Sequence, residues 1–439
     1  MTEIYPYSIL PEDATTEAVI CWIDDRDGAD GSSQILDWGD GSESTEGDEV
    51  PGSGGEAYRY EARPDGLNPD TEYSATIDGE VNVEWQTLPT SLEGESLDVV
   101  VFSDLHIDYL EEGFGDGSMV DEDDFGPVVD EAPDLVLFPG DLVTWGNEID
   151  PSQADADNTE QWLRFWRDYW GQMVNSHGLV PICMVPGNHE VGNHRWGGRE
   201  PTEEEEDDWD WHEPEPDTGF FQFFFSAFAD MEPAGENYAQ ITVGDYLQVL
   251  ALDTHSAYTV DVESWLSEGQ IDHDVHHCIP MFHSPMLPGG ERHPPDAELQ
   301  ERLREQWAPY LDDADNVRTT FVGHIHTRKR SVPWTIVDDE PDGNSFDIGD
   351  GYFTSSSVAD GITEFGDGYA KTRDPDNEWF LDQASAEKQF YSLEITEESI
   401  EMEVVDENGQ SYESHTLPPD VQAVIFGDVV LGDLTIGQS

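Results

Sequence analysis

Three short runs dominated by apolar residues occur within the first 190 positions of the chain, and each one ends in a polar cluster. The runs cover residues 97–102, 135–138 and 180–185. Runs of this length and composition are typical of parallel strands buried on both faces. Between the second and third runs, residues 159–176 carry aromatic residues at helical spacing. This strand–helix–strand alternation predicts an α/β core built on a parallel sheet.

Polar residues with metal-ligand chemistry follow these runs, and two similar clusters come later in the chain. The five clusters lie at residues 103–106, 140–142, 187–190, 281–285 and 321–326. Ligands of open α/β sheets bind beyond the carboxyl ends of the strands, where all five clusters would lie. Their Asp, Asn and His side chains are hard to borderline ligands for divalent cations. The sequence therefore predicts a metal site at this edge of the sheet.

The order of the clusters resembles a known signature. Asp-x-His, Gly-Asp, Gly-Asn-His-Glu, His and Gly-His-x-His follow one another between residues 98 and 326. One Gly-Asp pair occurs by chance in many chains, whereas five pieces in this order, each after an apolar strand, are specific. The pattern resembles the calcineurin-like metallophosphoesterase superfamily. The resemblance implies a four-layer α-β-β-α sandwich and a phosphoesterase that uses two divalent ions. Each ion could be Mn, Fe, Zn or Co.

The resemblance also implies roles for individual residues. It implies seven metal ligands, divided between two ions that share one of them: Asp104, His106 and His326 on the first, Asn188, His283 and His324 on the second, and Asp141 on both. A carboxylate suits the shared position because its two oxygens can serve two cations ~3.5–4 Å apart. His189 resembles a residue that faces the substrate, so we expect it to protonate the leaving group or stabilise charge. Glu190 would orient His189.

The N-terminal part of the chain shows short alternating runs between Asp/Gly turns, which predicts β-structure throughout. Within it, residues 65–73 resemble the penultimate-strand signature of fibronectin type III modules. We therefore expect a fibronectin-type-III-like β-sandwich over residues 1–92 and a metallophosphoesterase domain over residues 93–419. A C-terminal tail would occupy residues 420–439. Residues 191–217, which are strongly acidic, are expected to form a loop or lid inserted in the catalytic domain.

A fibronectin-like module ahead of such a catalytic domain resembles the layout of purple acid phosphatases. This resemblance implies that Arg292 and His293, about ten positions after the ligand His283, contact the substrate. Two positions depart from the purple enzymes, because His106 replaces their Gly and Thr144 replaces their iron-binding Tyr. A neutral imidazole in place of a tyrosinate predicts a metal site without the purple colour.

The charge of the chain restricts its partners. Asp and Glu number 99 against 17 Lys and Arg, which gives a formal net charge of −82, and the acid is spread along the whole sequence. Nucleic-acid binding normally requires a basic face, and none is seen, so we expect no nucleic-acid partner. The composition resembles that of proteins from extreme halophiles, where concentrated salt screens repulsion between surface carboxylates.

The remaining sequence features concern redox state and location. Cys21, Cys183 and Cys278 show no spacing typical of a disulfide framework, so we expect free thiols. No basic leader precedes an apolar stretch, and no segment approaches the ~20 apolar residues of a membrane span. We therefore expect a cytoplasmic protein without membrane contact. The sequence does not indicate an oligomeric state.

Three functions agree with these observations to different degrees. A phosphomonoesterase is favoured, and a phosphodiesterase acting on nucleotides or small diesters is the alternative. A non-catalytic scaffold with a vestigial metal site is less favoured, because all the expected ligands are present. The group His273, His276 and His277 is interpreted as part of a solvated loop or strand edge rather than as a third metal site.

Overall fold

A computed structural model of the chain provides the fold. It describes residues 4–39, 41–107, 125–143, 156–190, 219–226, 231, 237–254, 262–287, 294–356, 361–366 and 378–417. Several predicted features lie outside these residues: Thr144, the acidic insert at 191–217, Arg292, His293 and the tail at 420–439.

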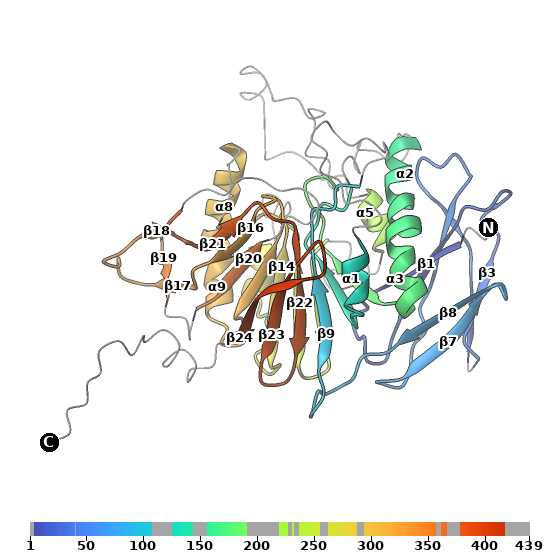
Figure 1. Cartoon of the computed structure of the whole chain (residues 1–439), viewed down its shortest axis with the longest axis horizontal. Helices are drawn as coiled ribbons and strands as arrows, with labels where there is room; N and C mark the ends of the chain where they lie inside the picture. Colours follow the sequence, from blue (N-terminus) through green and yellow to red (C-terminus); the bar gives the residue numbers. More distant parts are fainter. Residues whose placement is uncertain are drawn as a thin grey trace, which may run out of the picture.

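Two large β-sheets form the centre of the molecule (Figure 1). The ten-stranded sheet contains, in spatial order, β24 (Ser411–Leu417), β23 (Ile400–Asp406), β22 (Gln389–Ile395), β9 (Leu97–Val101), β10 (Leu135–Phe138), β11 (Pro181–Met184), β1 (Ile4–Ile9), β2 (Val19–Asp24), β6 (Tyr58–Ala62) and β5 (Asp48–Glu49). The seven-stranded sheet contains β12 (Ala239–Val243), β13 (Leu247–Leu252), β14 (His277–Phe282), β15 (Thr319–Val322), β20 (Thr363–Gly366), β16 (Arg328–Ser331) and β21 (Leu381–Ser385).

The three apolar runs form the parallel centre of the ten-stranded sheet, as predicted. β9 pairs with β10 and β10 with β11, both in parallel, and β10 and β11 are buried along their whole length. The predicted helix between them is present as α2 (Ala156–Arg164), a π-helical turn at Phe165–Tyr169 and α3 (Trp170–His177). The aromatic residues of this segment pack into the core, which explains their helical spacing.

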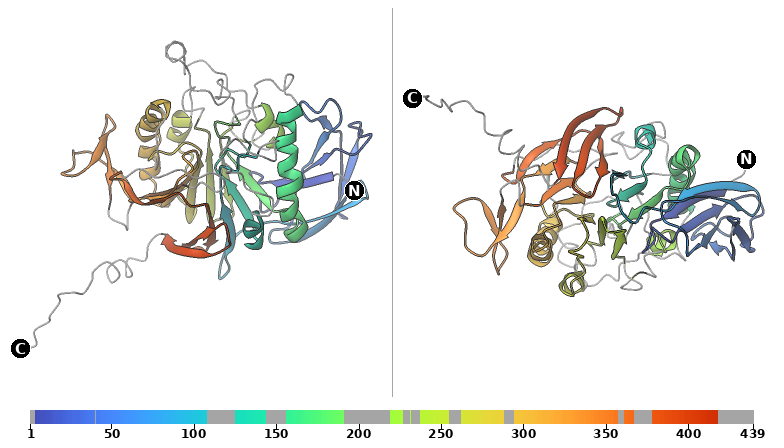
Figure 2. Two further views of the ribbon diagram at one scale, coloured as in Figure 1. Left: turned by 45° about the horizontal axis from the view of Figure 1, so that its top comes forward. Right: turned by 90° about the horizontal axis from the view of Figure 1, so that it is seen from below.

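The two faces of the seven-stranded sheet pack against different layers. Val249, Met281 and Phe321 belong to a core shared with the ten-stranded sheet. Leu250 and Phe282, one residue further along their strands, belong to a second core with residues of α8 and α9. Side chains of successive strand residues point to opposite faces, so this alternation places the sheet between the other sheet and a helical layer. Together with the helices beside the ten-stranded sheet, this gives the predicted four layers (Figure 2).

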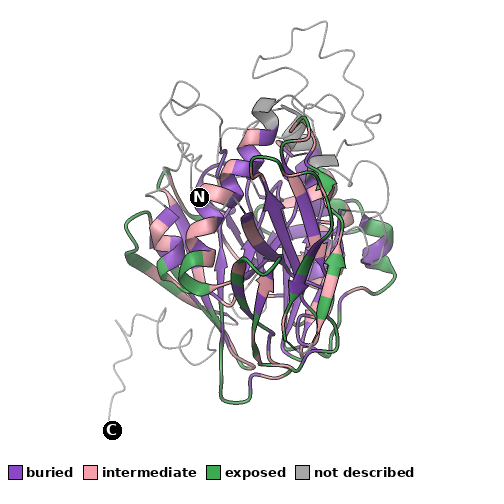
Figure 3. Cartoon of the chain, turned by 90° about the vertical axis from the view of Figure 1, so that its right-hand side faces the viewer, coloured by how far each residue is buried: buried purple, intermediate pink, exposed green. Residues whose placement is uncertain are grey.

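The remaining elements are five helices and a small sheet of the described chain. The other described helices are α1 (Gly126–Asp130), α5 (Gly219–Phe224), α7 (Val262–Ser267), α8 (Pro294–Gln306) and α9 (Ala308–Asp312). A three-stranded sheet contains β17 (Trp334–Val337), β19 (Tyr352–Ser355) and β18 (Ser345–Asp347). Both central sheets are buried along most of their length, and exposed residues lie mainly on the outer strands and loops (Figure 3).

The N-terminal region is antiparallel β-structure in two layers. One layer, formed by β1, β2, β6 and β5, is part of the ten-stranded sheet, because β1 pairs in parallel with β11 through Ser8–Pro181 and Ile9–Ile182. The other is a four-stranded sheet of β4 (Ser42–Thr45), β3 (Gln34–Asp37), β7 (Glu72–Ile77) and β8 (Val81–Gln86). The two layers enclose a core that includes Trp22 and Trp85. Backbone pairing therefore crosses the expected boundary at residue 92, and the fibronectin type III class stays a prediction.

Two further predictions concern the cysteines and membrane-spanning segments. All three cysteines are buried free thiols, as predicted. Within the parts of the chain that the structure describes, no helix reaches the length and hydrophobicity that a membrane span needs.

Candidate metal centre

The seven predicted ligands converge from both central sheets. Asp104, Asp141 and Asn188 follow β9, β10 and β11 of the ten-stranded sheet, whereas His283 and His324 follow β14 and β15 of the seven-stranded sheet. Parallel strands of one sheet end at the same edge, and the two sheets present that edge together. This convergence explains why residues more than 200 positions apart along the chain come into contact.

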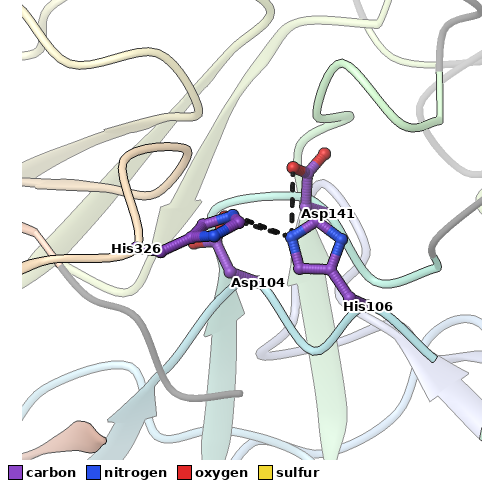
Figure 4. A group of neighbouring side chains, drawn as sticks. All are labelled: Asp104, His106, Asp141 and His326. Atoms are coloured by element: carbon purple, nitrogen blue, oxygen red, sulfur yellow. Dashed lines mark hydrogen bonds and ion pairs between the residues drawn. The ribbon is translucent and has the colours of Figure 1, made fainter. Parts of the chain in front are cut away.

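The first cluster consists of Asp104, His106, Asp141 and His326, all buried (Figure 4). The Nε2 atoms of His106 and His326 lie 2.8 Å apart. His326 Nε2 is 3.2 Å from Asp104 Oδ1, and His106 Nε2 is 3.6 Å from Asp141 Oδ2. Two imidazole nitrogens and two carboxylates that point at one small volume form a donor set that fits a divalent cation.

The second cluster consists of Asp141, His283 and His324, and Asn188 completes it. The Asn188 Oδ1 atom lies 3.1 Å from His283 Nε2 and 2.8 Å from His324 Nδ1. His283 Nε2 is also 3.2 Å from Asp141 Oδ2. The two clusters therefore share one atom, Asp141 Oδ2, which faces histidine rings from both sides. This donor set fits a second cation next to the first.

The backbone at the site is strained. Among the described residues, eight non-glycine residues have positive φ, and five of them are predicted ligands: Asp104, His106, Asp141, His324 and His326. Positive φ is unfavourable for residues with a Cβ atom, and such conformations persist where surrounding contacts enforce them. Their concentration here indicates that the need to point the ligand side chains into the site, rather than the backbone preference of these residues, determines the turns.

Three motif glycines allow the turns to approach one another. A Cβ atom on Gly140 would lie 2.7 Å from His283 Nδ1, and one on Gly323 would lie 2.6 Å from Asp104 Oδ2. A Cβ on Gly187 would collide with the Asp141 carboxylate. Any larger residue would push a ligand out of position, which is a physical reason for glycine at these points. These glycines belong to the sequence motifs, but the contacts that require them join turns that are distant along the chain.

Buried partners orient the ligands from outside the clusters. His283 Nδ1 is 2.7 Å from the Pro139 carbonyl oxygen, which can only accept a hydrogen bond. In the neutral ring the proton therefore sits on Nδ1, which leaves the Nε2 lone pair for a cation. The Asp104 carboxylate accepts hydrogen bonds from the backbone N–H of His324 at 2.9 and 3.2 Å and from the Ser103 hydroxyl. No sequence pattern predicts this contact between the Pro139 carbonyl oxygen and His283.

Glu190 is fully buried and connects two of the ligand-bearing turns. Its carboxylate accepts the backbone N–H groups of Asp141 at 2.8 Å, Leu142 at 2.8 Å, Val143 at 3.2 Å and Gly187 at 2.7 Å. These contacts hold the turn after β10 against the turn after β11. The expected role of Glu190 in orienting the His189 ring stays a prediction.

His189 lies beside the two clusters without belonging to either. Its ring packs edge-on against His106, with 4.6 Å between the ring centroids, and its Nε2 is 3.8 Å from Asp141 Oδ2. Its side chain is 15% exposed, more than that of His106, His283 or His326. This position agrees with a group that faces solvent or substrate rather than a ligand.

The electrostatics of the centre reflect a high density of acid and imidazole. Burial alone would raise the pKa of Asp141, but the His283 and His189 imidazoles hold it well below its usual range. Burial alone would lower the pKa of His283, but the Asp141 carboxylate raises it to about 10. Burial raises the pKa of Glu190 to about 8, and the charge of Asp141 adds to that shift. A site that binds a proton this tightly on His283 is arranged to hold positive charge.

Comparisons with known proteins agree with this geometry. Residues 97–328 match the model of the calcineurin-like phosphoesterase family. A comparison with the sequences of curated proteins finds no match.

Solved structures that share the fold include a purple acid phosphatase and PhoD. The purple acid phosphatase PPD1 from yellow lupin (Lupinus luteus) seeds is 15% identical with a TM-score of 0.64, and the similarity covers 97% of this chain and 76% of that one. PhoD is 12% identical with a TM-score of 0.58, over 93% of this chain and 87% of that one.

The family match covers more than half of the chain and every residue of both Asp/His clusters. The chain therefore belongs to the calcineurin-like phosphoesterase family, and its buried clusters are those of a metallophosphoesterase.

Proposed function

We propose that the protein is a phosphomonoesterase that uses two divalent cations. The observation that supports this proposal most directly is the shared atom Asp141 Oδ2, which is 3.2 Å from His283 Nε2 and 3.6 Å from His106 Nε2. Asp104, His106 and His326 would hold one cation, and Asn188, His283 and His324 the other. Asp141 would contribute to both sites, and the His189 backbone N–H, which donates to its Oδ1 at 3.0 Å, fixes the carboxylate between them.

Two divalent cations bound at these positions would neutralise charge on the phosphate oxygens and acidify a water molecule. The protein supplies the geometry: buried carboxylates and neutral imidazoles fix the positions of both cations, so a phosphate group is oriented when it binds. His189 is the group of the site that we propose donates a proton to the leaving oxygen, because its ring borders both clusters and reaches solvent.

We propose a broad metal preference, including Mn, Fe, Zn and Co, since Asn, Asp and neutral His bind several of these ions. His106 in place of a Gly, and Thr144 in place of a Tyr, would give an iron-loaded protein without the tyrosinate–iron colour of purple enzymes. The visible spectrum of protein loaded with ferric iron tests this. A strong band would mean that a tyrosine reaches the metal.

Three further features belong to the proposal. The N-terminal region would be a fibronectin-type-III-like sandwich, Arg292 and His293 would contact a small phosphate ester, and the acidic surface would suit high salt. The two-layer antiparallel arrangement of the N-terminal strands and the net charge of −82 support the first and third.

The test is metal analysis combined with turnover of a generic monoester and a generic diester by protein purified in high salt. Two cations per chain and a larger kcat/KM for the monoester support the proposal. A larger kcat/KM for the diester would favour the phosphodiesterase, and a protein that binds metal but turns over neither substrate would be a scaffold.

A further inference from the structure

An ion pair that belongs to neither metal cluster is fully buried in the seven-stranded sheet. Lys329 on β16 and Glu364 on β20 lie 2.5 Å apart, with side chains 1% and 0% exposed. The chain contains few cations, 17 against 99 acidic residues. Burial also lowers the pKa of Lys329, so keeping this lysine charged costs free energy in the folded protein. The position of the pair therefore needs an explanation.

The pair binds the turn that follows His283. The Glu364 carboxylate accepts the backbone N–H groups of Met286 and Leu287, each at 3.0 Å. The Lys329 ammonium donates to the Leu287 carbonyl oxygen. Arg304 of α8 donates to the Met286 carbonyl oxygen, so the polar groups of two consecutive residues are all held by side chains. These contacts begin three residues after His283.

The same pair is fixed to the strand that follows His326. Lys329 lies three residues after His326 and pairs with Gly366 across β16 and β20. A Cβ atom on Gly366 would lie 2.5 Å from Lys329 Cε, so this glycine makes room for the lysine to reach Glu364. The Ser331 hydroxyl accepts the Glu364 backbone N–H at 2.9 Å. The ammonium and carboxylate are thus held in place from both strands.

Gly366 also connects the strands of the Lys329–Glu364 pair to the ten-stranded sheet. Its carbonyl oxygen accepts hydrogen bonds from the Tyr391 hydroxyl at 2.5 Å and from Gln389 Nε2 at 3.2 Å, both on β22 of the ten-stranded sheet. The ten-stranded sheet carries Asp104 and Asp141. The contacts therefore run from the sheet that supplies the carboxylates, through β20, to the turn of His283 and to the strand of His326.

We propose that the Lys329–Glu364 pair is a positioning device that sets the spacing between His283 and His326, and hence between the two cations of the centre. His283 serves one cation and His326 the other in the proposed function, on which this inference rests. An apolar pair of similar volume would fill the same space at lower desolvation cost, but it would offer no directed contacts to the turn at residues 286 and 287. The pair is a positioning pair, since it touches neither cation nor substrate.

The test uses the full chain loaded with Mn²⁺. Two manganese ions that share a bridging carboxylate are magnetically coupled, and electron paramagnetic resonance distinguishes a coupled pair from isolated ions. We expect the wild type to bind two Mn²⁺ per chain as a coupled pair. Lys329→Met combined with Glu364→Gln removes both charges and keeps one backbone acceptor. This double variant should fold, lose most of the coupled signal and bind at least one ion roughly 10–100-fold more weakly, the range for loss of groups that orient ligands.

Two further variants separate positioning from stability. Gly366→Ala leaves both charges intact but displaces the lysine stem, so it should weaken the coupled signal in the same direction. Arg330→Gln is the matched control on the same strand, because Arg330 pairs with Glu413 and Asp382 instead. It should keep the wild-type Mn²⁺ stoichiometry and signal. Hydrogen exchange at the Met286 and Leu287 amides should speed up in the first two variants only.

The outcomes distinguish this inference from the proposed function. A double variant and a Gly366→Ala variant that keep the coupled signal, both affinities and wild-type KM would overturn the inference. Equal losses in Arg330→Gln would also overturn it, because the effect would then be general destabilisation of β16. A wild type that binds a coupled manganese pair but hydrolyses no phosphate ester would overturn the proposed function alone.

Discussion

His189 donates its backbone N–H to Asp141 Oδ1 at 3.0 Å, while its ring nitrogen Nε2 lies 3.8 Å from Asp141 Oδ2. One residue therefore fixes the carboxylate that both clusters share through its backbone and borders the same carboxylate with its side chain. Only the second contact is lost when the ring is removed. This separation makes the function of the ring accessible to mutation.

Replacement of His189 by Ala is expected to keep both metal ions, because the backbone N–H remains. Turnover of esters with poor leaving groups should fall by about 10²–10⁴, the usual contribution of a general acid. Esters with good leaving groups should be affected less, since they need no proton. Parallel kinetics on the two substrate types, with metal analysis of the same samples, measure this. Loss of metal from the variant would mean that the ring is a ligand.

Replacement of Glu190 by Ala would leave four buried backbone N–H groups without their acceptor. Each such group costs about 1–3 kcal/mol, so the free energy of unfolding should fall by several kcal/mol. Glu190→Gln, which keeps one carbonyl acceptor, should lose less. Denaturant unfolding of both variants tests the prediction. If Glu190→Ala is as stable as the wild type and only its kinetics change, the carboxylate acts on His189 instead.

The metal-free protein should lose stability as the pH rises. The pKa of His283 increases from 6.5 to about 10 on folding, and that of Asp141 falls below its ordinary value of 3.8, so the pair stabilises the fold fully between about pH 3.8 and 6.5. That contribution disappears as the pH rises through about 10. Thermal unfolding of chelator-treated protein should show this loss, and His283→Asn should show a smaller one.

The same proton should make metal binding dependent on pH. A cation can bind His283 Nε2 only when that nitrogen is deprotonated, so binding releases a proton. The apparent affinity should therefore rise by up to about tenfold per pH unit between neutral pH and about pH 9. Calorimetric titration in buffers with different ionisation enthalpies measures the proton release. An affinity that is constant over this range would show that His283 is already neutral.

The acidic surface should make stability depend on salt. The Debye length falls from ~30 Å at 0.01 M salt to ~3 Å at 1 M, so added salt screens the repulsion that accompanies a net charge of −82. The Tm should rise across a salt series. A Tm that stays constant or falls would contradict the interpretation of the composition as halophilic.

Local sequence patterns predicted the parts of the structure that depend on local chemistry. The apolar run at 97–102 indicated a buried strand, and Asp104 and His106 directly after it indicated a ligand turn. Parallel strands of one sheet bring such turns together. The meeting of turns from two sheets was implied by the resemblance to a four-layer family rather than by the local pattern.

Contacts between segments that are distant along the chain could not be predicted from local sequence patterns. The pairing of β1 with β11 joins residues more than 170 positions apart, and nothing in the run at 4–9 distinguishes it from a strand of a separate sandwich. The contacts of Glu190 with backbone N–H groups depend on the positive φ of Asp141. The Lys329–Glu364 pair depends on a glycine on the neighbouring strand.

Asp141, which both clusters share, would hold both cations, and metal stoichiometry tests this role most directly. Asp141→Asn keeps the size and the hydrogen-bonding side chain but removes the shared charge. Elemental analysis should give two divalent ions per chain for the wild type, whereas Asp141→Asn should retain markedly fewer and lose phosphatase activity. An Asp141→Asn protein that still holds two ions per chain and turns over a phosphate ester at the wild-type rate would contradict the claim.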